Sequence, residues 1–397
     1  MSKCFLMFLL TSVISAQVVS PVDARIAAAQ QQVKAKPQSA VSYDNLAGAL
    51  IRKARDYGDQ TLYVKASTAA DQALQLSKDD YDAQKMRAAI LLGMDQPTDA
   101  LALATALHKK VPDDLVGWSL LVDANVALGN YDEAEKAAQW ILDLRPGSAL
   151  GFEKAAGLRE LFGDVEGSVE FYDEAIRRTS QNDGDQRAWL LTQKARLLLS
   201  VGNTKAAIDM LAQATRLFPD SQLALAVKAQ VSTAEGNFTE AAKLFEQRYQ
   251  TVPSAANLYD WAEALAKAGQ TEAASVEFKK FENSKPHDAT LQLISYYADR
   301  KNDPAEALVL AAKRADMRHD AATLEVYAWA LYRNGKFEEA KVQMEKALAV
   351  GLRNSAYFCQ AARIEASAKD SAAAERYAKE GSCPAETQMQ TASGVTR

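Results

Sequence analysis

A single period runs through most of this 397-residue chain and constrains its fold more than any other feature. The segment GNYDEAEKAAQWILDLRP, residues 129–146, opens with a turn dipeptide and closes on a proline, which cannot continue a helix. A chain that repeats such a unit must stack its copies, because one unit alone cannot bury its apolar face. The turn position recurs at nearly constant spacing, at Gly58, Gly93, Gly129, Gly163, Gly202, Gly236, Gly269, Asn302, Gly335 and Lys369.

Small residues flank this turn at fixed distances, where two helices must approach closely. Five residues after it stand Ala134, Ser168, Ala207, Ala241, Ala274, Ala307, Ala340 and Ala374. Seven residues before it stand Val122, Ala156, Ala195, Ala229, Ala262, Ser295, Ala328 and Ala362. Prolines that would end the second helix follow the turn at one constant distance, at Pro146, Pro219, Pro253 and Pro286.

This pattern resembles the tetratricopeptide repeat, a helix, a turn and an antiparallel helix in about 34 residues. The large-residue positions of that repeat are filled by Trp118, Phe152, Tyr172, Phe245 and Phe278. The resemblance covers residues 41–384 and implies an all-α, right-handed superhelical solenoid of about ten helical hairpins. Exported bacterial proteins of this family are the most similar, which implies a place in the cell envelope.

The N-terminus has the composition of a secretory signal peptide. Lys3 precedes an apolar run from Phe5 to Leu10, and small residues lead to Ala16. We expect cleavage near Ala16 and export of the remainder to the periplasm or the medium, with no membrane span afterwards. Residues 17–40 are predicted to form a linker and a capping helix, 41–384 the solenoid, and 385–397 a disordered tail.

The sequence contains no constellation that indicates catalysis. The three histidines fall in different repeats without metal-ligand spacing, and no nucleophile, P-loop or dinucleotide motif is present. A net charge of −5 without long basic runs argues against a nucleic-acid partner. We therefore predict a protein with no enzymatic activity, no metal and no cofactor.

Two cysteines remain once Cys4 leaves with the signal peptide. Cys359 lies ten residues before its turn position and Cys383 fourteen after it, so both stand at similar heights in one hairpin. Export favours a disulfide between them. The alternative is a pair of unrelated buried thiols.

The concave face of the solenoid is the predicted binding site. A stripe on each first helix, thirteen, ten, six and three residues before the turn, mixes aromatic rings with amides and charges, as binding surfaces do. The stripe includes Glu153, Glu160, Trp189, Thr192, Arg196, Gln230, Tyr259, Glu263, Gln292, Tyr296, Glu325, Trp329 and Tyr332. The alternative is that these rings pack against the neighbouring repeat.

The known carboxylate clamp of this family is not matched, since its positions hold Ser119, Asp123, Thr192 and Arg196. We predict a scaffold or adaptor in the cell envelope that binds an extended or helical segment of another protein, with Trp189, Tyr259, Tyr296 and Trp329 as anchors. The alternatives are glycan binding in polysaccharide or wall assembly, and a regulatory subunit of an envelope enzyme.

Overall fold

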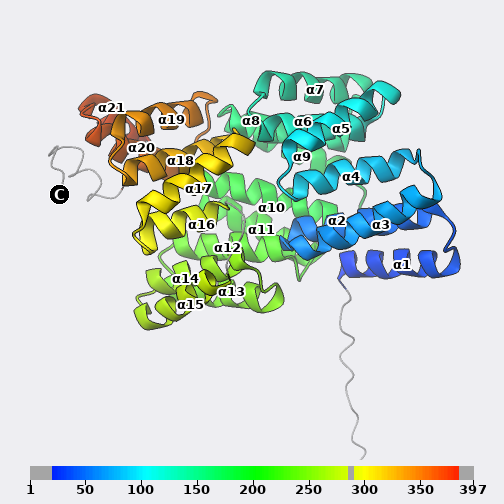
Figure 1. The fold of residues 1–397 in the computed structure, drawn as a ribbon, viewed down its shortest axis with the longest axis horizontal. Helices are drawn as coiled ribbons and strands as arrows, with labels where there is room; N and C mark the ends of the chain where they lie inside the picture. The colour runs from blue at the N-terminus through cyan, green and yellow to red at the C-terminus, as the bar shows by residue number, and fades with distance from the viewer. Residues whose placement is uncertain (1–19, 285–289, 384–397) are drawn as a thin grey trace, which may run out of the picture.

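The computed structural model describes residues 20–284 and 290–383, and every regular element within these ranges is a helix (Figure 1). The predicted signal peptide and the predicted tail, 385–397, lie outside the described residues. None of the helices in the described part is long and apolar enough to cross a membrane. The helices are α1 (Pro21–Ala35), α2 (Ala40–Tyr57), α3 (Gln60–Leu76), α4 (Tyr81–Gly93), α5 (Pro97–Lys110), α6 (Leu115–Ala127), α7 (Tyr131–Leu144), α8 (Ala149–Leu161), α9 (Val165–Arg178), α10 (Gly184–Ser200), α11 (Thr204–Leu217), α12 (Gln222–Ala234), α13 (Phe238–Thr251), α14 (Ala255–Lys267), α15 (Thr271–Asn283), α16 (Leu291–Ser295), the π-helical turn η1 (Tyr296–Arg300), α17 (Pro304–Met317), α18 (Ala321–Arg333), α19 (Phe337–Ala349), α20 (Ser355–Ser367) and α21 (Ser371–Glu380).

These helices pack as consecutive hairpins, from the α2–α3 pair to the α20–α21 pair, with α16 and η1 together forming one first helix. The capping helix α1 packs on α2 and buries Val22. All the predicted small residues except the half-buried Ser295 are buried at the hairpin contacts, with Ala134, Ala207 and Ala340 fully buried. The prediction of an all-α solenoid of helical hairpins is therefore confirmed.

Nine of the ten predicted turn positions have a left-handed backbone, including the two non-glycine residues Asn302 and Lys369. The exception is Gly93, which ends α4, and the left-handed residue of that turn is Asp95 with φ of 62°. The prediction was wrong by two residues because α5 begins at Pro97, where its missing N–H is tolerated, so the turn must lie directly before it. Pro112 then follows the corrected turn at the same distance as the other prolines follow theirs.

The solenoid coils until its first hairpin touches the start of α10 and the loop between α11 and α12. Arg52 on α2 donates from Nη2 to Asp183 Oδ1 at 2.5 Å and from Nε to Asp185 Oδ2 at 2.8 Å. Next to this pair, the buried carboxylate of Asp56 accepts hydrogen bonds from Ser221 Oγ at 2.6 Å and from the Gln222 N–H at 2.9 Å. Asp183 and Asp185 belong to the loop and helix start that make one repeat longer than the others.

A second contact joins the other half of the coil. Figure 1 shows α18 reaching the region of α6 and α8, which lie far from it in the sequence. The His319 N–H donates to the Ala127 carbonyl at 3.1 Å, and Arg318 Nη1 donates to Asp95 Oδ1 at 2.5 Å. The loops at Gly163 and Gly351 meet with so little space that a Cβ on Gly163 would lie 2.3 Å from the Gly351 carbonyl oxygen.

Four carboxyl groups, two buried and two half-buried, have a pKa that burial raises. It raises the pKa of Asp44 and of Glu325 to about 7, and that of Asp56 and of Asp260 to about 6. The hydrogen bonds to Asp56 and the nearby Arg248 guanidinium beside Asp260 only partly offset this effect. These groups bind protons more tightly in the folded than in the unfolded chain.

The last hairpin is covalently closed. Cys359 on α20 and Cys383 after α21 form a disulfide, with Cα atoms 5.5 Å apart. Within residues 20–284 and 290–383, this hairpin has a neighbouring hairpin on one side only, so it lacks there the second interface that stabilises an internal repeat.

We expect Gly163→Ala to destabilise the chain far more than Gly236→Ala. Both glycines occupy the same turn position, with φ of 76° and 77°, so both alanines suffer left-handed strain of about 1 kcal/mol. Nothing lies within 4 Å of a Cβ at Gly236, whereas the Cβ at Gly163 would strike the Gly351 backbone and separate the two halves of the coil. Urea unfolding and small-angle scattering of both variants check this. Equal losses, with no expansion of Gly163→Ala, would mean that the contact does not hold the coil closed.

We expect the melting temperature to fall as the pH rises from 5.5 to 8. A carboxyl group with a raised pKa in the folded chain binds its proton more tightly there than in the unfolded chain. The stability that this contributes is lost as the pH rises from the unfolded pKa, near 4, to the folded pKa. Carboxyls with a lowered pKa, such as Asp164 and Asp370, affect stability only below that window. Circular-dichroism melts check the slope, and Glu325→Gln should flatten its upper part. A melting temperature that rises toward pH 8 would contradict this account.

We expect loss of the disulfide to loosen the terminal hairpin selectively. Opening a loop of 24 residues costs roughly 3 kcal/mol in the chain-entropy account. Cys359→Ser should therefore speed hydrogen exchange in α20 and α21 and leave exchange in α12 and α13 unchanged. The oxidised wild type and its reduced form serve as references, and uniform acceleration along the chain would contradict a local role.

Candidate functional site

The inner face of the coil carries a hollow of about 440 Å³, here called the inner chamber. Its walls come from the first helices α6, α8 and α10 and from the segments 318–322 and 352–357, which the second contact brings across the coil. Four of the predicted stripe residues line it, namely Glu153, Glu160, Trp189 and Arg196. The chamber therefore joins the predicted concave stripe to loops from the far end of the chain.

A polar network crosses the inner face beside the chamber. Arg55 on α2 donates to Gln186 Oε1 at 2.6 Å, and Gln186 donates to Glu153 Oε2 at 2.7 Å. Lys154 pairs with Asp123 at 2.7 Å. The Arg55 guanidinium also lies 4.2 Å from the centre of the Trp189 ring, so this ring is covered by a cation from another repeat.

The cations of the chamber are matched by carboxylates. Arg196 donates to Glu160 Oε2 at 3.0 Å, and Arg318 donates to Asp320 Oδ2 at 2.6 Å. Burial alone would lower the pKa of Arg196 and Lys154, but the adjacent carboxylates outweigh burial and raise the pKa of both. The charges thus stay ionised and fix the shape of the chamber. Burial also raises the pKa of the Tyr357 hydroxyl, which stays protonated.

The structure does not expose all the predicted stripe residues equally. Arg196 and Gln230 are exposed, and Trp189, Glu263, Gln292, Glu325 and Tyr332 are half-buried. Six members of the stripe are buried: Glu153, Glu160, Thr192, Tyr259, Tyr296 and Trp329.

Three of the four predicted anchor rings pack inside their own or adjacent hairpins. The rings of Tyr259 and Tyr296 lie 5.3 and 5.2 Å from that of Phe281, and Trp329 donates to Asp299 Oδ2 at 3.0 Å. Their burial matches the packing alternative for these rings. Trp189 is the predicted anchor that lines the chamber.

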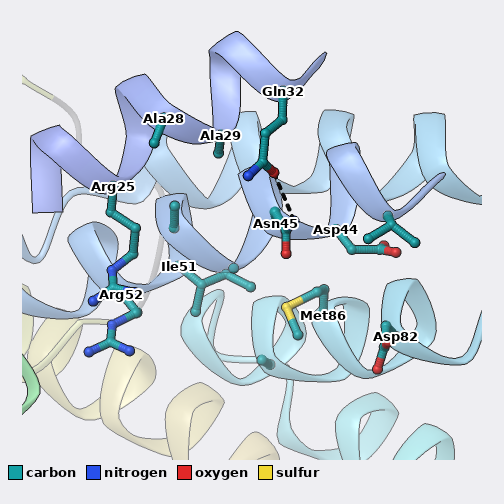
Figure 2. A pocket seen from close by; sticks show the side chains of 14 residues that line it. Arg25, Ala28, Ala29, Gln32, Asp44, Asn45, Ile51, Arg52, Asp82 and Met86 are labelled. Atoms are coloured by element: carbon teal, nitrogen blue, oxygen red, sulfur yellow. Dashed lines mark hydrogen bonds between the residues drawn. The ribbon is translucent and has the colours of Figure 1, made fainter. Parts of the chain in front are cut away.

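A second hollow, here called the N-terminal cleft, lies between α1, α2 and α4 and has a volume of about 610 Å³ (Figure 2). Figure 2 shows Asp44 and Asp82 at one end and Arg25 and Arg52 at the other. The side chains between these ends are mainly apolar, with Met86 and Ile51 prominent.

The sequence prediction missed this cleft and half of the chamber. The spacing that defines the stripe also selects Asn45, Gly48 and Arg52, which stand thirteen, ten and six residues before Gly58. The prediction left these residues out because the first two repeats are irregular. Placing the second turn at Asp95 also brings Asp82 into the stripe. Arg318, Asp320 and Tyr357 could not be found in this way, because a local period does not report closure between distant repeats.

Within 20–284 and 290–383, no group of three or more histidine, cysteine or acidic side chains is arranged to hold a metal ion. The chamber has paired charges, whereas the charges of the cleft are paired at the end that holds Arg25 and Arg52.

The comparisons with known proteins agree with this architecture. Residues 120–183 and 192–256 match the tetratricopeptide repeat family, whereas no curated protein matches the sequence. The Cut9–Hcn1 hetero-tetramer of the APC/C is similar in fold, with a TM-score of 0.53 and 14% identity over 85% of this chain and 58% of that one. This chain thus spans less than two thirds of that relative.

The human IFIT1 dimer with PPP-AAAA has a TM-score of 0.51 and 14% identity over 92% of this chain and 91% of that one. TTC0263 of Thermus thermophilus, a thermophilic protein of the same repeat type, shares 20% identity over 44% of this chain and 91% of its own, with a TM-score of 0.39. At identities this low, the likeness to the Cut9–Hcn1 and IFIT1 structures shows a shared fold alone. The matched segments lie in the middle of the chain, and helical hairpins of the same kind continue on both sides of them.

Proposed function

We propose that this protein is a non-catalytic scaffold of the cell envelope that binds a segment of another protein along the inner face of its coil. Tetratricopeptide repeats generally mediate contacts between proteins, and the inner chamber is the observation that carries the proposal. It brings residues of three consecutive first helices, including four stripe residues of α8 and α10, together with two distant loops. A partner segment there would contact both halves of the coil at once.

The chamber supports binding with little reorganisation. Its charged side chains are already held by partners, as Arg196 is by Glu160. A preformed site reduces the entropy lost when a partner is ordered. A carboxylate or cation of the partner can replace one member of such an ion pair. The chamber would therefore select partner segments by the arrangement of their charges.

The exposed and half-buried stripe residues are the proposed contacts, namely Trp189, Arg196, Gln230, Glu263, Gln292, Glu325 and Tyr332. The buried members, Glu153, Glu160, Thr192, Tyr259, Tyr296 and Trp329, would act by holding the first helices in position. The chamber is too small for a folded domain, so an extended or helical segment is the proposed partner.

Export is part of the proposal and rests on the N-terminal sequence together with the disulfide. Disulfides persist in oxidising compartments, and Cys359 and Cys383 are bonded in the structure. N-terminal sequencing of the chain recovered from cells should begin at Gln17. A start at Met1 would overturn export without affecting the binding proposal.

We expect an inner-face variant to lose its partner while a matched outer-face variant retains it. The test variant carries Arg196→Ala and Gln230→Ala, which are exposed on first helices. The control carries Arg177→Ala and Gln247→Ala, which are exposed on second helices. Crosslinked capture from envelope extract should recover at least fivefold less partner with the test variant. Equal recovery with both variants would place the binding surface elsewhere, and turnover of a substrate by the purified chain would overturn the non-catalytic assignment.

A further inference from the structure

We propose that the N-terminal cleft recognises a lysine or arginine side chain of the partner segment, held by Asp44 and flanked by an apolar residue of the same segment. This inference rests on the proposed function and names the chemistry of the partner. It concerns a site that lies apart from the inner chamber, between the capping helix α1 and the first helices α2 and α4 (Figure 2).

The unusual feature of the cleft is the carboxyl group of Asp44. This residue is only 8% exposed, it lines the cleft, and its Oδ1 atom has no hydrogen-bond partner among the described residues. A buried carboxylate oxygen without a donor is costly and uncommon in a folded protein. Its position at a hollow suggests that the missing donor comes from a ligand.

The charges around Asp44 are unbalanced. Burial raises the pKa of Asp44 most, and the charges of Asp80 and Asp82 together with a side-chain hydrogen bond to Asp80 raise it further, while Lys85 acts against them. Lys85 is itself engaged by Asp82 at 2.8 Å and by Asp114 at 3.3 Å. This end of the cleft therefore has an excess of carboxylates, and a ligand ammonium or guanidinium would relieve their repulsion.

The opposite end of the cleft is already neutralised. Arg25 and Arg52 point toward that end, and both pair with Asp183 and Asp185 at 2.5 to 3.1 Å. These arginines hold the first contact of the coil closed and have little capacity for an anionic ligand. A charged group of a ligand would therefore bind at the acidic end of the cleft.

The remaining walls suit a peptide better than a small polyamine. Met86 and Ile51 lie between the two charged ends, and Val41, which is 63% exposed, also lines the cleft. At the mouth, the Asn45 and Gln32 amides bond to each other at 2.9 Å and offer a donor and an acceptor to a peptide main chain. An apolar side chain and peptide groups would use these features, and a polyamine has neither.

The first experiment is an array of immobilised nonapeptides of random sequence, probed with the labelled full chain at pH 8. We expect the retained peptides to be enriched in lysine or arginine next to an aliphatic residue. Asp44→Asn, which keeps the shape of the side chain and removes its charge, should weaken binding of these peptides about tenfold. Asp71→Asn, an exposed carboxylate on α3 outside the cleft, is the matched control and should bind like the wild type.

A solution titration then isolates the cation. The best lysine peptide is compared with the same peptide carrying norleucine, which has the same chain length without the ammonium group. We expect at least tenfold weaker binding of the norleucine peptide to the wild type, and similar binding of both peptides to Asp44→Asn. Melting curves of Asp44→Asn should show an intact fold, since the change removes repulsion from Asp80 and Asp82.

The pH supplies an independent readout. Asp44 holds a cation only when ionised, and its pKa near 7 lies well below that of a lysine ammonium. Binding of the lysine peptide should therefore strengthen from pH 6 to pH 8 in the wild type and stay constant in Asp44→Asn. Asp80, Asp82, Lys85 and the paired arginines are the other charged groups that face the cleft.

Four outcomes would overturn the inference. Retained peptides without lysine or arginine enrichment, or equal binding by Asp44→Asn, would do so while leaving the proposed function intact. Spermidine that binds as tightly as the lysine peptide would mean a polyamine site. No retained peptide at all would overturn it too, and the capture experiment with the Arg196 and Gln230 variant would then decide the proposed function separately.

Discussion

Close packing of small side chains between neighbouring helices fixes the rotation from each hairpin to the next, and the rest of the structure depends on it. Ala134, Ala207 and Ala307 are fully buried at these contacts, so the second helix can approach only in one narrow range of positions. Because every unit repeats the same small rotation, the coil returns on itself. Asp95 then lies within reach of Arg318, and Asp56 within reach of Ser221.

Closure changes what the inner face can do. In an open solenoid the concave stripe faces solvent, whereas here several of its charges pair across the coil or with the next repeat. The guanidinium of Arg55 reaches from α2 to the Trp189 ring on α10. The same closure produces the chamber, because segments 318–322 and 352–357 complete walls that the first helices alone would leave open. Closure of the coil therefore both removes the open groove and forms the chamber.

The sequence contains the hairpin fold almost completely and the site only in part. The period predicts the turns well enough that Asn302 and Lys369, which are not glycines, occupy the left-handed positions expected of them. It fails at Gly93, where Pro97 shifts the turn, since a proline constrains the helix start more strongly than a glycine constrains the turn. The sequence predicts burial of Tyr259, Tyr296 and Trp329 only as an alternative. A stripe position specifies which way a side chain points from its helix, but not which other residues cover that side chain. Contacts such as Arg52 with Asp183 depend on summed rotations over several repeats, and no local pattern encodes that sum.

The loop that makes one repeat longer than the others has a consequence for how such a chain can evolve. An open array can gain or lose a whole unit by duplication or deletion, since each hairpin touches only its neighbours. In this protein, Asp183 and Asp185 at the end of the longer loop must meet Arg25 and Arg52, which lie far away in the sequence. Adding or removing a hairpin between them would place those carboxylates at the wrong angle around the coil. The geometry of this contact therefore fixes the number of hairpins between these residues. That part of the array cannot gain or lose single repeats as an open solenoid can.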